Sequence, residues 1–429
     1  MKIWTIKEGE PLPIPECPGR QMRCGIISEM LAQRGNDVTW WTSDFFHQTR
    51  TRLREAETVI QLSENYRLHM LHARTVYSRS ISLARIRYSS QLGKEFWRAA
   101  RETEKPDVIF CAYPLIDFAC EAVAYGKEFR VPVVVDIRDL WPDIFWEHFG
   151  SPVSGAVKAL CAPLRKKVSY LVEHADVTIG IIPECLQFVE AYGRKLREHD
   201  EVYFLAYQEK QFPPEERAAA ERFWREKGLS REDFILCWFG QINTQRTDFC
   251  MVADAVAADP RLKFIVCGDG PSLKELTEQY RGKKNIIFTG FLGHAELDSL
   301  MQISSVGIIP IRNSPAFSNT INNKAIEYMA GSLCIGTTLS GLQKQLVEEQ
   351  EMGFWFETSE GLEEELDRLI RDPELLHRRK ENARQYFEAN FRSETVYGKF
   401  CGLLEELGSL GTTEALGVNK QRRKAFRVI

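Results

Sequence analysis

Short apolar runs of strand length alternate with longer helical stretches along the whole chain. The runs are rich in Val, Ile and Phe with little polar alternation, which is typical of parallel strands buried on both faces. The predicted strands are Lys2–Ile6, Asp37–Thr42, Asp107–Ala112, Val131–Asp136, Val177–Ile182, Phe234–Gly240, Phe264–Gly268, Ile286–Gly290, Val306–Ile311 and Leu333–Thr337. The helical stretches between them include Gly19–Gln33, Ser272–Arg281, Ala295–Ile303 and Asn323–Ala330. This alternation predicts an α/β fold with doubly wound, Rossmann-like sheets.

The number of predicted strands indicates two domains, because single open sheets of about ten strands or more are uncommon. The best boundary is the polar segment Tyr207–Ala220, which contains Pro213-Pro214 and precedes a new helix-then-strand pattern. We therefore predict an N-terminal domain at residues 1–206 and a C-terminal domain at residues 207–390. The last helical pattern, Glu374–Leu407, is long enough to return across the first domain. Residues 391–429 are then a crossing helix with a basic tail.

Composition narrows the class of protein. The chain has 429 residues, 44% hydrophobic and 27% charged, so it can form cores and is not disordered. Its formal charge of −4 argues against a nucleic-acid coat, and we predict no nucleic-acid partner. The apolar run that begins at Met1 is too short for a signal peptide or a membrane span. The 11 cysteines form no Cys-x-x-Cys pair, which favours buried thiols in a reducing cytoplasm.

Positive charge is concentrated in two segments. Residues 73–101 carry seven Arg or Lys side chains against one acid, Glu95, and aromatic and aliphatic residues lie between them. Such a surface predicts a peripheral contact with an anionic membrane. The alternative is a solvated helical face with Phe96 and Trp97 in the core. A second basic run at residues 420–427 is interpreted as a loose tail or as a weak second membrane contact.

Polar residues follow several predicted strands, where doubly wound sheets bind their ligands. The strand Val131–Asp136 runs into Asp136-Ile137-Arg138-Asp139-Leu140-Trp141. Charges there are costly to bury alone, so they either line a cleft or form an internal ion pair. The loop after the first strand leads to Gly19-Arg20 at a helix start, which suits an anion. No G-x-G-x-x-G pattern is present, which lowers the case for a nicotinamide dehydrogenase.

In the second half, the turn after Phe239-Gly240 is polar and ends at Arg246, and Gly268-Asp269-Gly270 forms a tight strand-to-helix turn. The most informative segment is Ser318–Gly331, where a polar loop enters a helix carrying Lys324 and Glu327. Amides at such a helix start can hold a diphosphate, and a carboxylate one turn later can accept from a ribose diol. The alternative is a capped helix with a surface Lys–Glu pair.

Taken in order, these segments resemble the GT-B-fold glycosyltransferases, specifically the retaining family 4 enzymes. Within that family the chain is similar to bacterial surface-polysaccharide and N-acetylfucosaminyl-type transferases. The resemblance rests on Gly19-Arg20, residues 34–39, residues 134–142, Phe239-Gly240, residues 267–271, residues 285–290 and residues 323–330. It implies two Rossmann-like domains facing across a cleft, a nucleotide-sugar donor held mainly by the C-terminal domain, and an acceptor on the N-terminal side.

The resemblance also implies roles for individual residues. Glu327 matches a ribose-binding glutamate, Arg246 a diphosphate-binding lysine, and Asp139 a histidine near the reacting sugar; these three are the expected catalytic residues. Donor binding is expected from Gly19, Arg20, Gln241, Gly270, Phe291, Leu292, Asn319, Ile321, Asn322, Asn323 and Lys324. Phe291 and Leu292 would meet the nucleobase. Asp136 and Arg138 are expected on the acceptor side.

The expected reaction is transfer of a sugar from a UDP- or GDP-sugar to a glycan or lipid-linked acceptor in surface polysaccharide biosynthesis. The sequence has no Asp-x-Asp, so neither a metal nor another cofactor is expected. Two positions depart from the family: Asn319 replaces the first of two glutamates, and Gln241 replaces an arginine. These changes leave open a different donor, weaker donor binding or lost activity. The alternatives are therefore a non-catalytic partner subunit and a nucleotide-sugar 2-epimerase. The protein is expected in the cytoplasm, peripheral on the inner face of the cell membrane.

Overall fold

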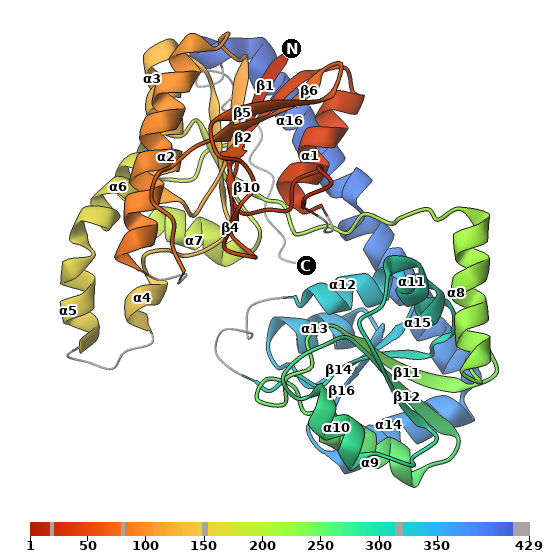
Figure 1. Ribbon diagram of the computed structural model, residues 1–429. Coiled ribbons are helices and arrows are strands. Elements are labelled where there is room, and N and C mark those ends of the chain that lie inside the picture. Colours follow the sequence, from red (N-terminus) through yellow and green to blue (C-terminus); the bar gives the residue numbers. More distant parts are fainter. Residues whose placement is uncertain (18–20, 79–81, 148–152, 314–320, 415–429) are drawn as a thin grey trace. The chain divides into compact units, whose positions relative to one another are not determined.

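The computed structural model describes residues 1–17, 21–78, 82–147, 153–313 and 321–414 (Figure 1). The chain divides into two compact units. Unit 1 contains Met1–Phe204 and the chain from Val396 onward, and unit 2 contains Leu205–Thr395. Each unit is an α/β domain built on a largely parallel sheet, which confirms the predicted fold class.

Unit 1 has an eight-stranded sheet in the order β10-β9-β8-β7-β1-β2-β6-β5. Its strands are β1 (Lys2–Ile6), β2 (Asp37–Ser43), β5 (Thr58–Ser63), β6 (Tyr66–Leu71), β7 (Val108–Ala112), β8 (Val133–Ile137), β9 (Val177–Gly180) and β10 (Glu201–Val202), and β3 (Phe45–Phe46) pairs with β4 (Thr51–Arg52). Its helices are α1 (Arg23–Gln33), α2 (Leu83–Glu102), α3 (Ile116–Phe129), α4 (Ile144–Glu147), α5 (Val153–Leu160), α6 (Ala162–His174) and α7 (Pro183–Ala191). The strand order reverses between β1 and β7, the place where such sheets bind ligands.

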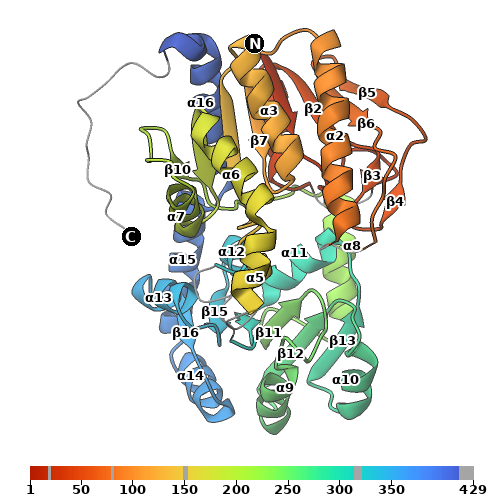
Figure 2. The ribbon, with the colours of Figure 1, turned by 90° about the vertical axis from the view of Figure 1, so that its left-hand side faces the viewer.

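Unit 2 has a six-stranded parallel sheet in the order β13-β12-β11-β14-β15-β16 (Figure 2). Its strands are β11 (Phe234–Phe239), β12 (Leu262–Cys267), β13 (Ile286–Gly290), β14 (Val306–Ile309), β15 (Cys334–Thr337) and β16 (Gly353–Trp355). Its helices are α8 (Pro214–Glu226), α9 (Phe249–Ala258), α10 (Leu273–Gln279), α11 (His294–Ile303), α12 (Asn323–Ala330), α13 (Leu342–Glu349), α14 (Ser359–Arg371) and α15 (Pro373–Asn390). The order reverses here between β11 and β14.

Strands β5 and β6 were not predicted, and their charge pattern explains why. β6 carries Arg67 and His69 within an otherwise apolar run. Arg67 pairs with Asp37 on β2, and Nε2 of His69 lies 2.7 Å from a Glu57 carboxylate oxygen. β5 runs antiparallel to β6 at the sheet edge, so it alternates between half-buried and exposed positions. A search for continuous apolar runs therefore misses both strands.

The single helix predicted over Glu374–Leu407 is wrong, because the structure has two helices there. α15 ends at Asn390 and α16 (Ser393–Glu414) begins three residues later. At the break, the Tyr207 amide donates to the Phe391 carbonyl at 2.8 Å, and the Ser393 amide donates to the Tyr207 carbonyl at 3.1 Å. Tyr207, on the segment that leads into unit 2, therefore bonds the Phe391 carbonyl and the Ser393 amide. In one continuous helix, both groups would be bonded within the helix. Nothing local in the sequence marks this exchange.

The cysteines are buried thiols, as the sequence predicts. All 11 are free, and nine of them are buried. Burial raises the pKa of the Cys237 thiol on β11 and of the Cys334 thiol on β15 to about 12. These thiols therefore stay protonated and pack as small apolar side chains.

Candidate functional site

Three neighbouring strands of unit 2 end in glycines with positive φ. The angles are 139° at Gly240, 141° at Gly268 and 75° at Gly290. A Cβ atom on Gly268 would lie 1.8 Å from the carbonyl oxygen of Gly240, and one on Gly270 would lie 2.3 Å from that of Ile242. The turns after β11 and β12 therefore pack backbone against backbone, and only glycine fits. The result is a closely packed main-chain edge at the carboxyl ends of the strands, in which the Gly240 amide donates to the Cys267 carbonyl at 2.9 Å and the Gly268 amide to the Gly290 carbonyl at 2.7 Å.

Lys324, in the first turn of α12, lies at this edge. A Cβ atom on Gly240 would be 2.7 Å from the Lys324 ammonium nitrogen, which also lies 4.6 Å from the centre of the Trp238 ring. Burial lowers the pKa of Lys324, and the charge of Glu327 partly opposes that fall. Since β11 and β14 flank the point where strand order reverses, this cation stands at the place where such sheets bind ligands.

Hydrogen bonds of Asn322 and of Gln343 on α13 fix the start of α12. The Asn322 side chain accepts from the Lys324 amide at 2.9 Å, and the Asn322 amide donates to the Gln343 side chain at 2.9 Å. Gln343 is buried and donates to the Thr337 hydroxyl at 2.7 Å. The predicted cap is therefore present, but Lys324 is desolvated and is not a surface residue. Asn322 orients the helix start, while Asn323 beside it is exposed.

The other predicted donor-binding residues in the described part of unit 2 lie on its turns, as does the predicted catalytic Arg246, whereas the predicted catalytic Glu327 lies on α12. Gln241 and Arg246 are exposed on the turn after β11, which the Thr244 and Ser272 hydroxyls brace at 2.9 Å. Phe291, just after β13, is 85% exposed, so its ring is free to stack on a ligand. Four of these predicted site residues are half-buried: Gly270, Leu292, Ile321 and Glu327. Gly19, Arg20 and Asn319 lie outside the described residues.

The carboxyl ends of β1 and β8 in unit 1 carry a buried charge network. Asp136 has no exposed surface, and it accepts from Arg23 at 2.9 Å and from Arg138 at 2.6 Å. Arg138 also pairs with Glu10. Burial raises the pKa of Asp136, but the two guanidinium groups outweigh it and hold the pKa below its usual range. Of the two interpretations from sequence, the structure shows the internal ion pair, so Asp136 is not presented to an acceptor.

A second group of titratable residues lies near the same strand ends. Glu8 is buried and accepts from the Tyr77 hydroxyl at 3.1 Å and the Tyr88 hydroxyl at 3.4 Å. Burial raises the pKa of Glu8 and also that of Asp139, which is half-buried. Burial and neighbouring arginines lower the pKa of His47 to about 4, so this imidazole is neutral. Sequence reasoning did not select Glu8, although three charged residues directly after a buried strand were a usable signal.

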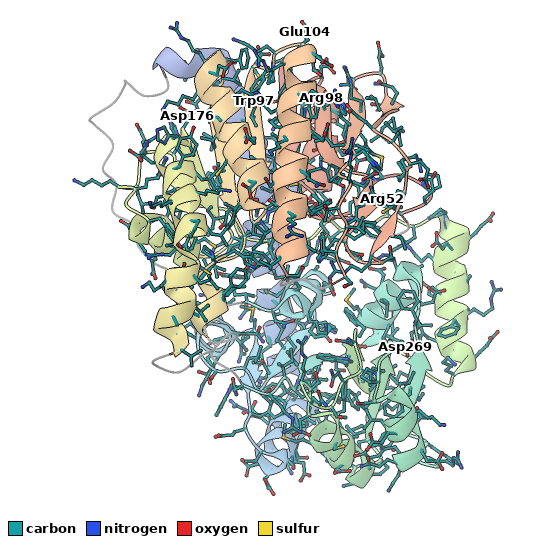
Figure 3. The ribbon with its side chains drawn as sticks, turned by 60° about the vertical axis from the view of Figure 1, so that its left-hand side comes forward. Arg52, Trp97, Arg98, Glu104, Asp176 and Asp269 are labelled. Atoms are coloured by element: carbon teal, nitrogen blue, oxygen red, sulfur yellow. The ribbon has the colours of Figure 1, made fainter. Side chains whose placement is uncertain are left out.

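The aromatic residues in the described part of segment 73–101 pack toward the core, so they do not line its solvated face, and the membrane contact of this segment stays a prediction. Tyr88 and Phe96 are fully buried, and Phe96 packs 5.2 Å from Trp41 between ring centres. Trp97 lies on the side of α2 toward α3, 6.3 Å from Tyr125 (Figure 3). Arg98 on the same helix pairs with Glu57 and Glu95. For this helix the structure shows the alternative from sequence, a solvated basic face over a core.

No group of three His, Cys, Asp or Glu side chains in the described segments is placed to hold a metal ion. None of the helices within those segments is both long enough and apolar enough to cross a bilayer. A cavity of about 530 Å³ lies between α8 and α11, lined in part by Arg217, Arg225 and Ser230. Ser230 precedes β11, so this cavity lies toward the amino end of that strand, opposite the glycine turns.

A family model matches the part of the chain that carries this site. Residues 222–386 match the family model described as Glycosyl transferases group 1. The match contains the glycine turns, Lys324 and Glu327, and lies wholly in unit 2. The chain is 25% identical over 187 residues to the alpha-monoglucosyldiacylglycerol synthase of Acholeplasma laidlawii, covering 41% of this chain and 44% of that protein. It is also 25% identical over 221 residues to a Bacillus subtilis (strain 168) protein named as a teichuronic acid biosynthesis glycosyltransferase, covering 49% and 52%.

The chain thus matches about half, or less, of the length of these curated relatives. Solved structures match it over nearly its full length. Sucrose-phosphate synthase from Thermosynechococcus elongatus has a TM-score of 0.68 at 17% identity, covering 95% of this chain and 99% of that chain. Anabaena HepE in complex with UDP-glucose has a TM-score of 0.58 at 17% identity, covering 95% and 100%. The chain therefore has the fold of the GT-B glycosyltransferases and carries a glycosyl transferases group 1 domain at residues 222–386.

Proposed function

We propose that this protein is a retaining glycosyltransferase of family 4. It moves a sugar from a UDP- or GDP-sugar to a glycan or lipid-linked acceptor in bacterial surface polysaccharide biosynthesis. The observation that carries the proposal is the glycine edge of unit 2 with the desolvated Lys324 ammonium beside it. The family match over the same residues supports it. HepE, with a similar fold, was solved with UDP-glucose, and the synthase and teichuronic acid relatives are named for lipid and polysaccharide products.

The proposed donor site follows from the chemistry of the edge. A diphosphate needs positive charge and close approach to the protein, and the glycine turns allow that approach because no Cβ atom stands in the way. Lys324 and Arg246 add two cations, and Lys324 acts strongly because it is desolvated. Glu327 would accept from the ribose, and the exposed Phe291 would stack on the base.

In the proposed reaction, negative charge grows on the departing diphosphate as the bond to the sugar breaks. Lys324 and Arg246 stabilise that charge more in the transition state than in the bound donor, which is how such groups accelerate a reaction. The sugar gains oxocarbenium character, as in glycoside hydrolysis. Asp139 of unit 1 is the proposed carboxylate near the reacting sugar. Arg138 is the proposed acceptor contact, although its side chain is only 13% exposed and pairs with Asp136 and Glu10. No metal or other cofactor is proposed.

A ligand screen tests the donor site directly. UDP, GDP and their sugar conjugates are added to the full chain, and the melting temperature is measured. A ligand that binds only the native state raises the melting temperature, by an amount that depends on its concentration relative to Kd. Lys324→Met should remove that shift, whereas Lys94→Met on α2 in unit 1 should keep it. A shift that survives Lys324→Met contradicts this placement of the donor site.

Two other functions remain to be tested, a partner subunit because of the sequence departures and a nucleotide-sugar 2-epimerase because it shares the two-domain fold. Gln241 lies exposed at the same edge without the charge expected there, which favours a partner subunit that has lost catalysis. Binding of a nucleotide sugar without transfer to any acceptor would support that candidate. A nucleotide-sugar 2-epimerase would instead convert the donor with no acceptor present, which product analysis of donor and enzyme alone detects.

A further inference from the structure

The cavity of about 530 Å³ between α8 and α11 has no role in the proposed transfer reaction. Its volume falls within the range of sites that hold small molecules. The two helices lie side by side in unit 2 (Figures 1 and 2). All of the lining residues lie between Arg217 and Ile303, a part of the chain that is described without a gap and belongs to unit 2. The cavity is therefore a feature of unit 2 by itself.

The buried residues that line the cavity are mainly apolar and are held in place. Trp224 of α8 is 1% exposed, and its indole N–H donates to the Glu296 carbonyl on α11 at 2.8 Å. Leu229, which follows α8, is also buried, and Ile303 ends α11 on the other side. The bond from Trp224 fixes the two helices to each other, so the cavity is formed before any ligand enters.

One buried polar group at the cavity lacks a partner. Ser299 of α11 lines the cavity and is 6% exposed, and its hydroxyl makes no hydrogen bond to any described residue. By contrast, the hydroxyl of Ser304, the C-cap of the same helix, donates to the Leu300 carbonyl at 2.8 Å. A buried hydroxyl without a hydrogen bond costs free energy, and a polar ligand in the cavity can supply the missing partner.

Three arginines line the same cavity: Arg217 and Arg225 of α8 and Arg231 of the turn before β11. None of their guanidinium groups lies within salt-bridge distance of a carboxylate in the described residues. Asp233, two residues after Arg231, instead pairs with Lys263 at 2.7 Å. Guanidinium groups match the geometry of phosphate oxygens and bind them through paired N–H donors. The arginines therefore favour a ligand with a phosphate group.

Two carboxylates at the cavity indicate that the ligand carries more than a phosphate. Glu221 of α8 stands one turn from Arg217 and one turn from Arg225. On α11, burial raises the pKa of Asp298, and the charge of Arg217 opposes that rise. Gln302 lies one turn after Asp298 and also lines the cavity. Carboxylate and amide oxygens accept hydrogen bonds from hydroxyl groups, so this wall suits a polyhydroxylated ligand.

We infer that this cavity binds a phosphorylated sugar as a second ligand of unit 2, separate from the donor. Arg225 and Arg231 hold the phosphate, while Asp298, Ser299 and Gln302 bond the sugar hydroxyls. The cavity lies toward the amino end of β11, whereas the proposed donor edge lies at its carboxyl end. The inference goes beyond the proposed function and does not depend on it.

Isothermal titration of the full chain tests this inference. The probes are glucose 1-phosphate, glucose 6-phosphate, inorganic phosphate and glucose, each at millimolar concentration. At least one sugar phosphate should bind, inorganic phosphate should bind at least about tenfold more weakly, and glucose should not bind detectably. Arg225→Gln/Arg231→Gln should weaken binding of the sugar phosphate at least about 30-fold, and Ser299→Ala about fivefold. Equal affinity for inorganic phosphate and the sugar phosphates overturns the inference.

A matched variant controls for unspecific attraction by positive charge. Arg222→Gln/Lys227→Gln also removes two exposed cations at α8, but neither residue lines the cavity. This variant should bind the sugar phosphate like wild type. An equal loss in this control overturns the inference, because the attraction then belongs to the charge of the helix and not to the cavity. Melting temperatures without ligand should agree among the variants and wild type, since the replaced arginines and lysine are exposed.

The donor screen separates this inference from the proposed function. Lys324→Met should keep binding of the sugar phosphate, and Arg225→Gln/Arg231→Gln should keep the melting-temperature shift given by a nucleotide. Loss of sugar-phosphate binding in Lys324→Met overturns the inference, because the phosphate then occupies the donor edge. Nucleotide binding by a wild-type protein that binds neither sugar phosphate overturns only the second site. Sugar-phosphate binding without binding of any nucleotide or nucleotide sugar overturns only the proposed function.

Discussion

The two units use the same sheet architecture but fill the carboxyl ends of their strands in opposite ways. In unit 1, the network of Arg23, Asp136, Arg138 and Glu10 occupies the space after β1 and β8. In unit 2, glycines at the ends of β11 and β12 let the two following turns pack main chain against main chain. The charged side chains of this network in unit 1 therefore neutralise one another inside the unit. In unit 2, the Lys324 ammonium stands beside these turns.

The two units also differ in how far neighbouring charges compensate a charged side chain that has lost its hydration. Asp136 is buried with two arginines, so its charge is compensated within the unit. Lys324 is desolvated, and among the described residues it is the charge of Glu327 that opposes the fall of its pKa. An under-compensated cation costs stability and is a frequent sign of a binding site. Substitutions should therefore affect stability in unit 1 and ligand binding in unit 2.

The largest expected effect is on the buried pair of unit 1. Arg23→Met should destabilise the protein by about 3–5 kcal/mol, because it removes one of the two guanidinium groups that compensate Asp136. Urea unfolding measures the change. Arg281→Met breaks the exposed pair with Glu278 and should cost less than about 1 kcal/mol. If the two variants lose similar amounts of unfolding free energy, the buried pair contributes no more to stability than the exposed pair, which contradicts the prediction.

The next largest effect is expected from adding a side chain at the glycine edge of unit 2. Gly268→Ala should destabilise unit 2 by about 3 kcal/mol and abolish nucleotide binding, since its Cβ would meet the Gly240 carbonyl at 1.8 Å. Gly282→Ala is the matched control. Gly282 also has a positive φ, 87°, but its Cβ would meet nothing within 4 Å. The control should therefore lose only about 1 kcal/mol and keep binding. Nucleotide binding by Gly268→Ala would contradict the proposed edge.

A third prediction concerns Lys324 in unit 2. Lys324→Met should lower kcat/KM about 100-fold by removing charge stabilisation of the leaving diphosphate, with the stability of the fold unchanged or slightly raised. The sign follows from its lowered pKa, because a desolvated ammonium opposes folding below its normal pKa. Steady-state kinetics and urea unfolding give the two numbers. A strongly destabilised variant would mean that Lys324 serves the fold, as Asp136 does.

The smallest effect concerns Glu8 in unit 1, whose pKa is raised by burial. Above the pKa of the unfolded carboxyl, the folded state must ionise a buried group, so stability falls as pH rises toward the raised pKa. Glu8→Gln removes this loss. It should be more stable than wild type near pH 7, by the order of 1 kcal/mol, and closer to it near pH 4. Unfolding at both pH values measures the difference, and a larger stabilisation at acid pH would contradict the assignment.

The sequence predicted the architecture more fully than the site. Strands such as Lys2–Ile6 and Ile286–Gly290 were predicted to the residue, because buried parallel strands are continuous apolar runs. The helix Asn323–Ala330 was also predicted to the residue, from its polar start and the glycine that follows it. Strands β5 and β6 were missed because their charges are neutralised by partners distant in sequence, which no local pattern reveals.

For the site, the sequence identified the turns but not the contacts that their residues make. It identified the tight turn at Gly268-Asp269-Gly270, yet the close approach of Gly268 to Gly240 joins two turns separated by a helix and a strand. It left open whether Asp136 lines a cleft or forms an internal pair. Only the approach of Arg23 from α1 decides that.

The sequence by itself determined the elements, the α/β class and the chemical types at the strand ends. These follow from local periodicity and from which residues tolerate each backbone geometry. The tertiary structure alone decided which charges are compensated and which apolar residues are covered. It placed Phe96 in the core and left Val153 and Leu160 of α5 exposed, although both lie in apolar, basic segments. Burial and charge pairing are sums over neighbours distant along the chain, so they arise only when the chain is folded.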